Sequence, residues 1–348
     1  MASMTTQTQM PRPMTVQEIE AACRELEPPG CEEYYNDAPA LTLETMLFPL
    51  GFPMRVRTNS AKALHVSRMK WSVFEQVFDT DPIETQIHEI ETQSRECPPA
   101  PVFRFMENML LVTADTDNVC VAQFPTGKTR MVVSSAAIAH PTYFSQTFLE
   151  AAPAAQIFTR LATPIHAACV AIGGCGVLLC GDSGAGKTSL SYACACAGWQ
   201  FISDDSIYLL HNETGRQVLG NCHQVRFRPS AAELFPEISG AEIAPRMYGK
   251  PSIELPTSLW PTINATRFAH IDFIVFLNRR QPDVKDLVQY RKDVARCYMR
   301  QNLFGTNQTK SAQYAAIERL LEAEVLELRY QSLDWAVGRL ERLVRERR

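Results

Sequence analysis

The chain has 348 residues, enough for two domains of ordinary size or for one large domain. Hydrophobic residues make up 46% of the sequence and charged residues 21%, which is typical of a globular protein that folds in water. A net charge of −4 supplies no basic field for nucleic acid or a membrane surface, and no run of about 18 apolar residues is present to form a membrane-spanning helix. We therefore expect partners other than nucleic acid or a membrane.

The first part of the sequence is predicted to form a flexible tail and a domain of mixed α+β class whose role is unknown. Residues 1–15 are polar and lack the charged start and apolar core of a secretory signal, and residues 16–160 form the domain. Strands are expected at residues 54–57, 102–105, 109–113, 119–123 and 129–133, of which the last four resemble an antiparallel meander. Helices are expected at residues 143–160 and at residues 60–78, the latter with an apolar face of Ala63, Val66, Met69 and Val73.

From residue 161 the pattern changes to apolar strands that alternate with glycine turns and helices, which predicts an α/β domain over residues 161–348. A buried strand at residues 177–180 is followed by a helix that begins at Lys187 and by a second strand at residues 201–203. A core strand is expected at residues 271–277. The last predicted elements are a helix at residues 312–323, a strand at residues 325–330 and a helix at residues 334–347 that carries Ala336, Leu340 and Leu343 on its apolar face.

A phosphate-binding loop follows the strand at residues 177–180. Residues 181–188, Gly-Asp-Ser-Gly-Ala-Gly-Lys-Thr, match the Walker A pattern at each fixed position, between a strand and a helix as the motif requires. Glycines let backbone N–H groups turn toward phosphate oxygens, and the helix N-terminus adds partial positive charge. Lys187 is expected to reach the β- and γ-phosphates of ATP, and the Thr188 hydroxyl to bind Mg²⁺. The residues predicted to bind the nucleotide are Gly181, Asp182, Ser183, Gly184, Ala185, Gly186, Lys187, Thr188 and Ser189.

Two acidic residues and one histidine are predicted to reach this loop. A right-handed strand–helix–strand crossover makes the strands at residues 177–180 and 201–203 parallel, so that Asp204 and Asp205 arrive at the same sheet edge as the loop. Adjacent carboxylates there can divide metal binding and proton abstraction, the alternative being a solvated turn. Upstream, a hairpin about Gly173-Gly174 sets His166 opposite Gly181, although a lone histidine is more often a structural residue.

The cysteines are expected to be small buried hydrophobes rather than ligands or disulfide partners. Four of them lie inside apolar runs, namely Cys169, Cys180, Cys194 and Cys196. The spacing of Cys194 and Cys196 does not fit a redox or zinc motif. Cysteines that are buried and form no disulfides favour the reducing cytoplasm as the location of the protein.

The run from His166 to Asp205 resembles the catalytic domain of HPr kinase/phosphorylase, in the phosphoenolpyruvate-carboxykinase-like group of P-loop proteins. The resemblance rests on His166, on Gly181 fifteen residues later and on the pair Asp204-Asp205. It implies a mixed sheet flanked by helices, with ATP and Mg²⁺ as cofactors. It also implies that Asp205 is the base that takes the proton from an acceptor serine hydroxyl, with support from His166 and Asp204. The family further suggests assemblies of several copies.

In two places the sequence departs from that family. The family's Leu-Glu-Ile-Arg-Gly segment, whose Glu helps hold the metal, corresponds here to Val225-Arg226-Phe227-Arg228-Pro229, where Arg228 aligns with the family's Arg and the acid is absent. Glu254 is the candidate replacement, so the predicted metal ligands are Thr188, Asp204 and Glu254. The family's segment for dephosphorylation is not evident, and the sequence therefore predicts neither phosphorylase activity nor HPr as the substrate. Candidate clamps for phosphate or substrate, with ordinary surface charge as the alternative, are Arg226, Arg228, Lys250 and Arg279.

The leading hypothesis is an ATP-dependent kinase that acts on a seryl or other hydroxyl of a protein, peptide or small molecule. In-line transfer needs positioning, Mg²⁺ and a base, and the predicted site contains all three. The alternative is an ATP-binding regulatory module with weak or no phosphotransfer, which the missing family Glu favours. A carboxykinase-type metabolic enzyme ranks last, because no second metal motif is visible.

Overall fold

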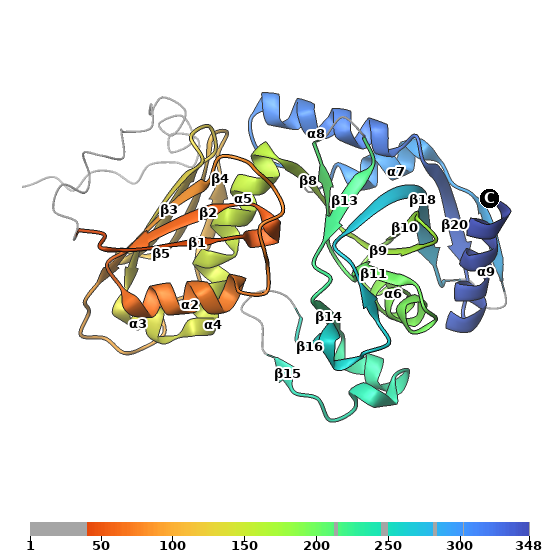
Figure 1. Cartoon of the computed structure of the whole chain (residues 1–348), viewed down its shortest axis with the longest axis horizontal. Helices are drawn as coiled ribbons and strands as arrows, with labels where there is room; N and C mark the ends of the chain where they lie inside the picture. The colour runs from red at the N-terminus through yellow and green to blue at the C-terminus, as the bar shows by residue number, and fades with distance from the viewer. Residues whose placement is uncertain (1–39, 212–214, 245–249, 281–283, 302, 348) are drawn as a thin grey trace, which may run out of the picture. The chain divides into compact units, whose positions relative to one another are not determined.

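The computed structural model describes residues 40–348 apart from residues 212–214, 245–249, 281–283, 302 and 348. The predicted tail at residues 1–15 and the start of the predicted N-terminal domain lie outside the described residues. Leu41–Arg348 forms one compact unit that contains a seven-stranded sheet and a ten-stranded sheet (Figure 1). The chain passes from the first sheet to the second between the helix Ala151–Arg160 and the strand Ala162–Ile165, and we propose the domain boundary at residue 160 on this basis.

The seven-stranded sheet has the order β1-β2-β3-β7-β6-β5-β4. Its strands are β1 (Leu43–Leu47), β2 (Met54–Thr58), β3 (Ile83–Ile90), β4 (Val102–Phe105), β5 (Met109–Asp115), β6 (Asn118–Gln123) and β7 (Lys128–Ser134). The predicted meander is confirmed, since β4 to β7 pair antiparallel in sequence order. β1 and β3 were not predicted. β3 pairs in parallel with both β2 and β7, and it alternates buried Ile83, Thr85 and Ile87 with less buried polar residues.

The helix predicted at residues 60–78 is shorter than expected and buries a different face. α2 (Ala61–Trp71) begins at Ser60, whose side chain accepts a hydrogen bond from the Ala63 N–H. Its buried side chains are those of Ala63, Leu64, Ser67 and Trp71. Only Ala63 of the predicted apolar face is buried, whereas Met69 is 66% exposed and Val73, beyond the end of the helix, is 50% exposed. Both the predicted set and the observed set of residues recur at helical spacing. Packing against the sheet determines which set is buried.

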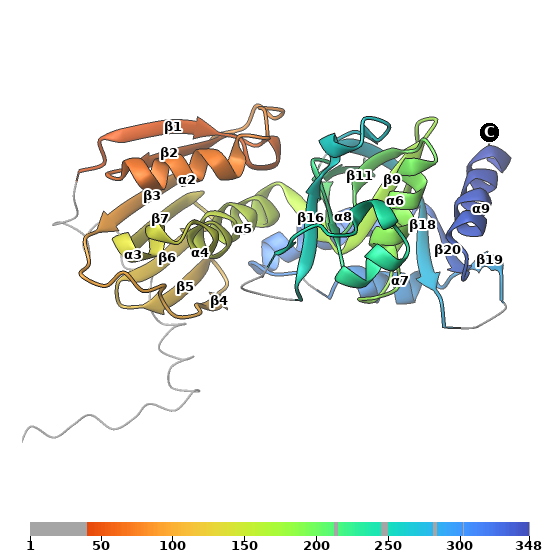
Figure 2. The same cartoon turned by 90° about the horizontal axis from the view of Figure 1, so that it is seen from below.

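Three further helices and one turn follow the meander. They are α3 (Ser135–Ala139), α4 (Pro141–Phe144), a π-helical turn (Ser145–Leu149) and α5 (Ala151–Arg160). The helix predicted at residues 143–160 is therefore interrupted by a wider turn between α4 and α5. Figure 2 shows α4 and α5 beside the seven-stranded sheet.

The ten-stranded sheet carries the phosphate-loop segment at its centre. Its main path is β17-β11-β9-β10-β18-β13-β12-β8, and β20 joins β18 and β19. The strands are β8 (Ala162–Ile165), β9 (Ala167–Ile172), β10 (Cys175–Cys180), β11 (Gln200–Ser203), β12 (Ile207–Leu210), β13 (Gln217–Gly220), β17 (Asn264–Ala265), β18 (Phe268–Asn278), β19 (Asp286–Gln289) and β20 (Glu324–Arg329). A separate three-stranded sheet consists of β14 (Gln224–Phe227), β16 (Ser252–Pro256) and β15 (Ile243–Ala244).

The strand–helix–strand prediction needs one correction. β10 and β11 do point in the same direction, but they are not neighbours, because β9 lies between them and pairs antiparallel with both. β9 forms a tight hairpin with β10 and therefore occupies the edge of β10 at which β11 was expected. The chain that follows the helix after the loop instead adds β11 to the other edge of β9. The mixed α/β class and the mixed sheet flanked by helices are confirmed.

Helices cover both faces of the ten-stranded sheet (Figure 1). In β10, Val177 and Leu179 face the core shared with α6 (Lys187–Cys196) and α9 (Leu333–Glu346). Leu178 and Cys180 face the opposite core, which α7 (Lys292–Met299) and α8 (Asn307–Leu320) cover. This is the period of two expected for a strand buried on both faces.

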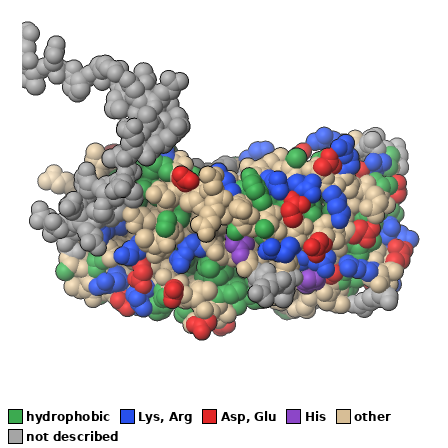
Figure 3. Space-filling model, turned by 90° about the horizontal axis from the view of Figure 1, so that it is seen from above, with side chains coloured by type: hydrophobic (Ala, Val, Ile, Leu, Met, Phe, Trp, Pro, Cys, Tyr) green, Lys and Arg blue, Asp and Glu red, His purple; other side chains and the backbone are tan. Residues whose placement is uncertain are grey.

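The predicted C-terminal elements are present with small shifts in their ends. The predicted core strand at residues 271–277 is β18, and α9 buries Ala336, Leu340 and Leu343 as expected. Cys169, Cys180 and Cys194 are buried, but Cys196 is exposed because it lies two positions from Cys194 on α6 and faces away from the core. None of the described helices is long and apolar enough to cross a membrane. On the surface shown in Figure 3, basic and acidic side chains are interspersed.

Candidate functional site

The loop between β10 and α6 has a backbone that depends on its glycines. Gly181, Gly184 and Gly186 have φ angles of 148°, 88° and 96°, a region that favours glycine. A Cβ atom on Gly186 would also lie 2.9 Å from the Tyr330 hydroxyl oxygen, so a side chain there would be both strained and crowded. The loop leads into the N-terminus of α6, where free backbone N–H groups and the helix dipole favour an anion.

Lys187 folds back over this loop. Its ammonium group donates hydrogen bonds to the carbonyl oxygens of Gly181 at 2.6 Å and Asp182 at 3.3 Å, and only 6% of the residue is exposed. Burial lowers the pKa of Lys187, while the nearby Asp205 carboxylate opposes that shift. The side chain is thus held at the loop with a charge that a phosphate group would stabilise. Thr188 and Ser189 follow in the first turn of α6 and are partly exposed.

The structure brings His166 to the loop in the predicted register. β9 and β10 pair up to Ala167 opposite Cys180, so His166 and Gly181 follow as the next facing residues. The His166 Nδ1 atom lies 3.4 Å from the Asp205 Oδ1 atom. Burial lowers the pKa of His166, the positive charge of Lys187 lowers it further, and Asp205 opposes both effects. The imidazole is therefore neutral at pH 7 and able to orient the carboxylate.

Asp204 differs sharply from its neighbour in environment. It is 6% exposed, and its Oδ2 atom accepts a hydrogen bond of 3.0 Å from the backbone N–H of Arg226. Burial raises the pKa of Asp204 to about 7, and the charge of Asp205 acts in the same direction. Asp205 is the more exposed of the two, with 41% of its side chain accessible. Two adjacent carboxyl groups with such different surroundings can take different roles.

We expect Asp204→Asn to change how stability depends on pH. Between pH 4 and pH 7 folded Asp204 keeps a proton that the unfolded chain has released, so the contribution of this group to the free energy of unfolding falls as pH rises through this window. Asparagine does not titrate, so the Asn variant lacks this fall. Its free energy of unfolding should rise relative to that of the parent by up to about 1.4 kcal/mol for each unit of pH. Urea unfolding of both proteins at several pH values measures the difference, and a difference that is constant with pH would contradict the raised pKa.

Glu254 lies across a strand pair from the segment that holds Asp204. Arg226 of β14 pairs with Glu254 of β16, and the Arg226 Nε atom lies 3.3 Å from the Glu254 Oε1 atom. Glu254 also accepts hydrogen bonds from Gln224 at 2.9 Å and from Ser252 at 3.0 Å. Arg226 therefore contacts Asp204 through its backbone and Glu254 through its side chain, although nothing in the sequence between residues 226 and 254 indicates this pairing.

The remaining candidate clamps differ in their position. Arg228 is exposed and close enough to Lys187 to lower its pKa, and Lys250 is exposed. The Arg279 guanidinium lies over the Tyr330 ring at 5.6 Å and beside Gly186 of the loop. Arg280, which the sequence analysis did not select, forms an ion pair of 3.2 Å with Asp182. Two arginines after β18 are thus placed at the phosphate loop.

Tyr298 is a site residue that the sequence analysis missed. Its hydroxyl oxygen, from α7, lies 2.7 Å from the His166 carbonyl oxygen and 2.9 Å from the Gly181 carbonyl oxygen, and it accepts a hydrogen bond of 3.2 Å from the Gly181 N–H. The hydroxyl therefore connects the residue before β9 with the first residue of the loop. No motif could have indicated it, because Tyr298 comes 117 residues after Gly181.

A magnesium ion fits this site only together with phosphate oxygens. Among the described residues, no group of three His, Cys, Asp or Glu side chains is placed to hold a metal. Mg²⁺ bound with nucleotides commonly takes one or two protein oxygens, and the other ligands are phosphates and water. The Thr188 hydroxyl at the loop and the Asp204 carboxyl at the end of β11 are suitable oxygen donors for that arrangement.

Comparison with known proteins agrees with the motifs. Residues 159–253 match the family described as the HPr serine kinase C-terminal domain, and this segment makes up 95 of the 348 residues. It contains the loop, His166, Asp204 and Asp205, and it ends one residue before Glu254. Among solved structures, the HPr(Ser) kinase/phosphatase from Coxiella burnetii is 18% identical, with 53% of this chain and 99% of that chain covered and a TM-score of 0.28. No curated protein sequence matches the chain.

Proposed function

We propose, on the premise that residues 159–253 form an HPr-serine-kinase-like domain, that the chain is an ATP-dependent kinase whose acceptor is a seryl or other hydroxyl group of a protein, peptide or small molecule. The observation that carries the proposal is the contact of 3.4 Å between His166 and Asp205, next to a phosphate loop with a buried lysine. A loop that only bound nucleotide would not need an oriented carboxylate beside it.

The proposed reaction assigns one task to each group. The backbone N–H groups of the loop and the Lys187 ammonium hold the β- and γ-phosphates of ATP. Asp205 accepts the acceptor's hydroxyl proton while the hydroxyl oxygen forms a bond to the γ-phosphorus. The bond from the γ-phosphorus to the bridging oxygen breaks, and ADP leaves with that electron pair. Neutral His166 keeps the Asp205 carboxylate turned toward the acceptor.

Mg²⁺, when bound with ATP, neutralises developing charge on the phosphate oxygens. The residues proposed to hold it are Thr188 and Asp204, with Glu254 in place of the acid that the HPr-kinase segment carries. The raised pKa of Asp204 belongs to the chain without metal, and a cation beside this carboxyl would favour its ionised form.

The test is transfer of labelled γ-phosphate from ATP, with Mg²⁺, to hydroxyl acceptors in extract from the native cell. The expected result is a labelled, acid-stable phosphoester on a defined acceptor, identified by mass spectrometry. If ATP binds with Mg²⁺ and no acceptor is phosphorylated, the alternative of a nucleotide-binding regulatory module replaces the kinase proposal.

A further inference from the structure

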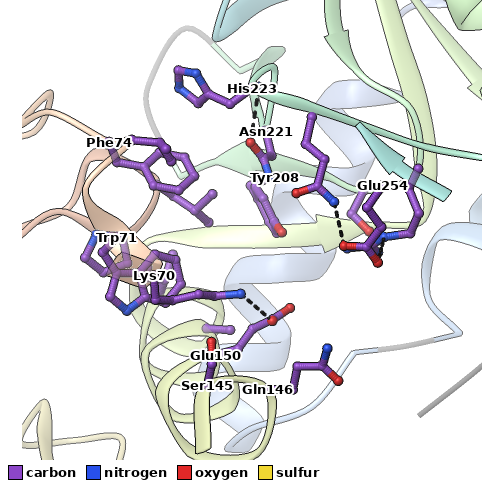
Figure 4. A pocket seen from close by; sticks show the side chains of 18 of the residues that line it. Lys70, Trp71, Phe74, Ser145, Gln146, Glu150, Tyr208, Asn221, His223 and Glu254 are labelled. Atoms are coloured by element: carbon purple, nitrogen blue, oxygen red, sulfur yellow. Dashed lines mark hydrogen bonds and ion pairs between the residues drawn. The ribbon is translucent and has the colours of Figure 1, made fainter. Parts of the chain in front are cut away.

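A cavity of about 960 Å³ lies beside His166 (Figure 4). Of the groups proposed to act in phosphate transfer, His166 lines this cavity, whereas Asp205 and Lys187 do not. His166, Arg226 and Glu254 line it, as does Ser206, the residue after Asp205. Lys70, Trp71 and Phe74 come from α2 and the turn after it. Figure 4 shows Lys70 and Trp71 across the cavity from Tyr208 and Asn221, and the Phe74 ring lies edge to face with the His223 ring, with 5.3 Å between their centroids. This volume is at the upper end of the range for small-molecule sites and exceeds what a single amino acid needs.

Three of the four apolar residues predicted to be buried in the segment at residues 60–78 line the cavity, while Ala63 is buried. The three are Val66, Met69 and Val73. Met69 is 66% exposed and Val73 is 50% exposed, which is high for large apolar side chains grouped on one surface. Contiguous apolar side chains at a concave surface are typical of a binding site.

Among the described residues that line the cavity, each lysine and arginine side chain is already paired with a carboxylate. Among the described residues that line it, the lysine and arginine side chains are those of Lys70 and Arg226. Lys70 forms an ion pair of 2.7 Å with Glu150, and Arg226 contacts Glu254 at 3.3 Å. The other polar lining groups are largely uncharged, including Ser145, Gln146, Asn221 and Gln224. Such a surface suits amide groups and apolar side chains better than carboxylates or phosphates.

We propose that this cavity binds the phosphate acceptor, and that the acceptor is a seryl or threonyl residue within a short, uncharged and partly apolar peptide segment. The inference rests on the proposed function and names the substrate class of the same site. The hydroxyl enters beside His166 and Ser206, the peptide's amides pair with the amide side chains of the wall, and its apolar side chains pack on Met69 and Val73. The transfer step is the one given above.

Acceptor binding and phosphate transfer can be measured separately. The acceptors are acetylated, amidated peptides with one central serine flanked by Leu, Val, Ala or Gln, matched peptides flanked by Glu, and free serine. Trp71 lies in the cavity wall, so binding of the neutral peptides should change its fluorescence, and Trp71→Phe should remove that change. Met69→Asp places a charge in the apolar surface, and His65→Asp places the same charge on an exposed position of α2 that does not line the cavity.

We expect phosphorylation of the neutral peptides with a kcat/KM at least tenfold above that for the acidic peptides and free serine. Met69→Asp should raise KM for the neutral peptide at least tenfold without changing KM for ATP, and His65→Asp should stay within twofold of the parent. Equal effects of the two variants, or equal use of the acidic peptides or free serine, would overturn the inference while leaving the kinase proposal intact. Binding that depends on Met69 without transfer would support the cavity as a peptide site and overturn the kinase proposal instead. Neither binding nor transfer would overturn both.

Discussion

Replacing Asp205 with Asn is expected to lower kcat for phosphate transfer by about 10²- to 10⁴-fold, the usual contribution of a positioned base. The amide has the size of the carboxyl group and can still contact His166, but it cannot accept the hydroxyl proton. Affinity for ATP should stay within about twofold, because Lys187 and the loop remain. Rates under single-turnover conditions, together with calorimetric titration of ATP and Mg²⁺, separate the two effects.

A matched control for this variant is Asp286→Asn. Asp286 is exposed on β19 and its side chain bonds to the adjacent Leu287 N–H, so the same chemical change there should leave kcat unaltered. An Asp205→Asn protein that transfers phosphate at the parent rate would remove Asp205 as the base.

Replacing Lys187 with Met is expected to weaken binding of ATP by about ten- to a hundredfold and to abolish detectable transfer. The first figure follows from the loss of about 1.5–3 kcal/mol for hydrogen bonds to a charged group, at about 1.4 kcal/mol per tenfold change in Kd. The stability of the fold should not decrease, because removing a buried ammonium group with a lowered pKa also removes the free-energy cost of burying its charge. The expected result is therefore loss of ATP affinity with an unchanged or higher midpoint of thermal unfolding.

Calorimetric titration and thermal unfolding of the same preparations test both halves of this result. Lys62→Met, at an exposed position of α2, is the control and should bind ATP as the parent does. Parent-like affinity in Lys187→Met would show that the loop does not bind phosphate through this lysine. Unfolded Lys187→Met protein would instead mean that the bonds to Gly181 and Asp182 stabilise the loop itself.

The features that the sequence predicted well depend on residues close together in the chain. The Walker A pattern needs eight consecutive residues, and its glycines adopt the φ angles that the motif requires. The pairing of His166 with Gly181 depends on a tight turn at Gly173-Gly174 and two short strands, so one hairpin determines it. The buried face of α9 follows from a single amphipathic pattern with no competing stripe.

Predictions were less successful where the sequence allowed more than one face of an element to be buried, or more than one strand to be its neighbour. α2 offers two apolar stripes, and the alternation of β3 is weakened because polar Thr85 and His88 occupy buried positions. The strand after α6 was expected next to β10, but the hairpin from β9 had already taken that edge. In each case the local pattern permits more than one arrangement, and the packing of the whole fold selects one of them.

By itself, the sequence predicted the Walker A segment between a strand and a helix, the pairing of His166 with Gly181, and the position of Asp204 and Asp205 after a strand that runs parallel to the one before the loop. Local geometry and short connections are enough to place these residues. Only the tertiary structure decided that Tyr298 bonds to the loop, that Glu254 lies beside Arg226, and that Met69 and Val73 face a cavity next to His166. These contacts join residues far apart in the chain or depend on which surfaces remain uncovered after packing. The spacing of residues in the sequence does not predict these contacts, because they depend on the free energy of the whole fold rather than on any one segment.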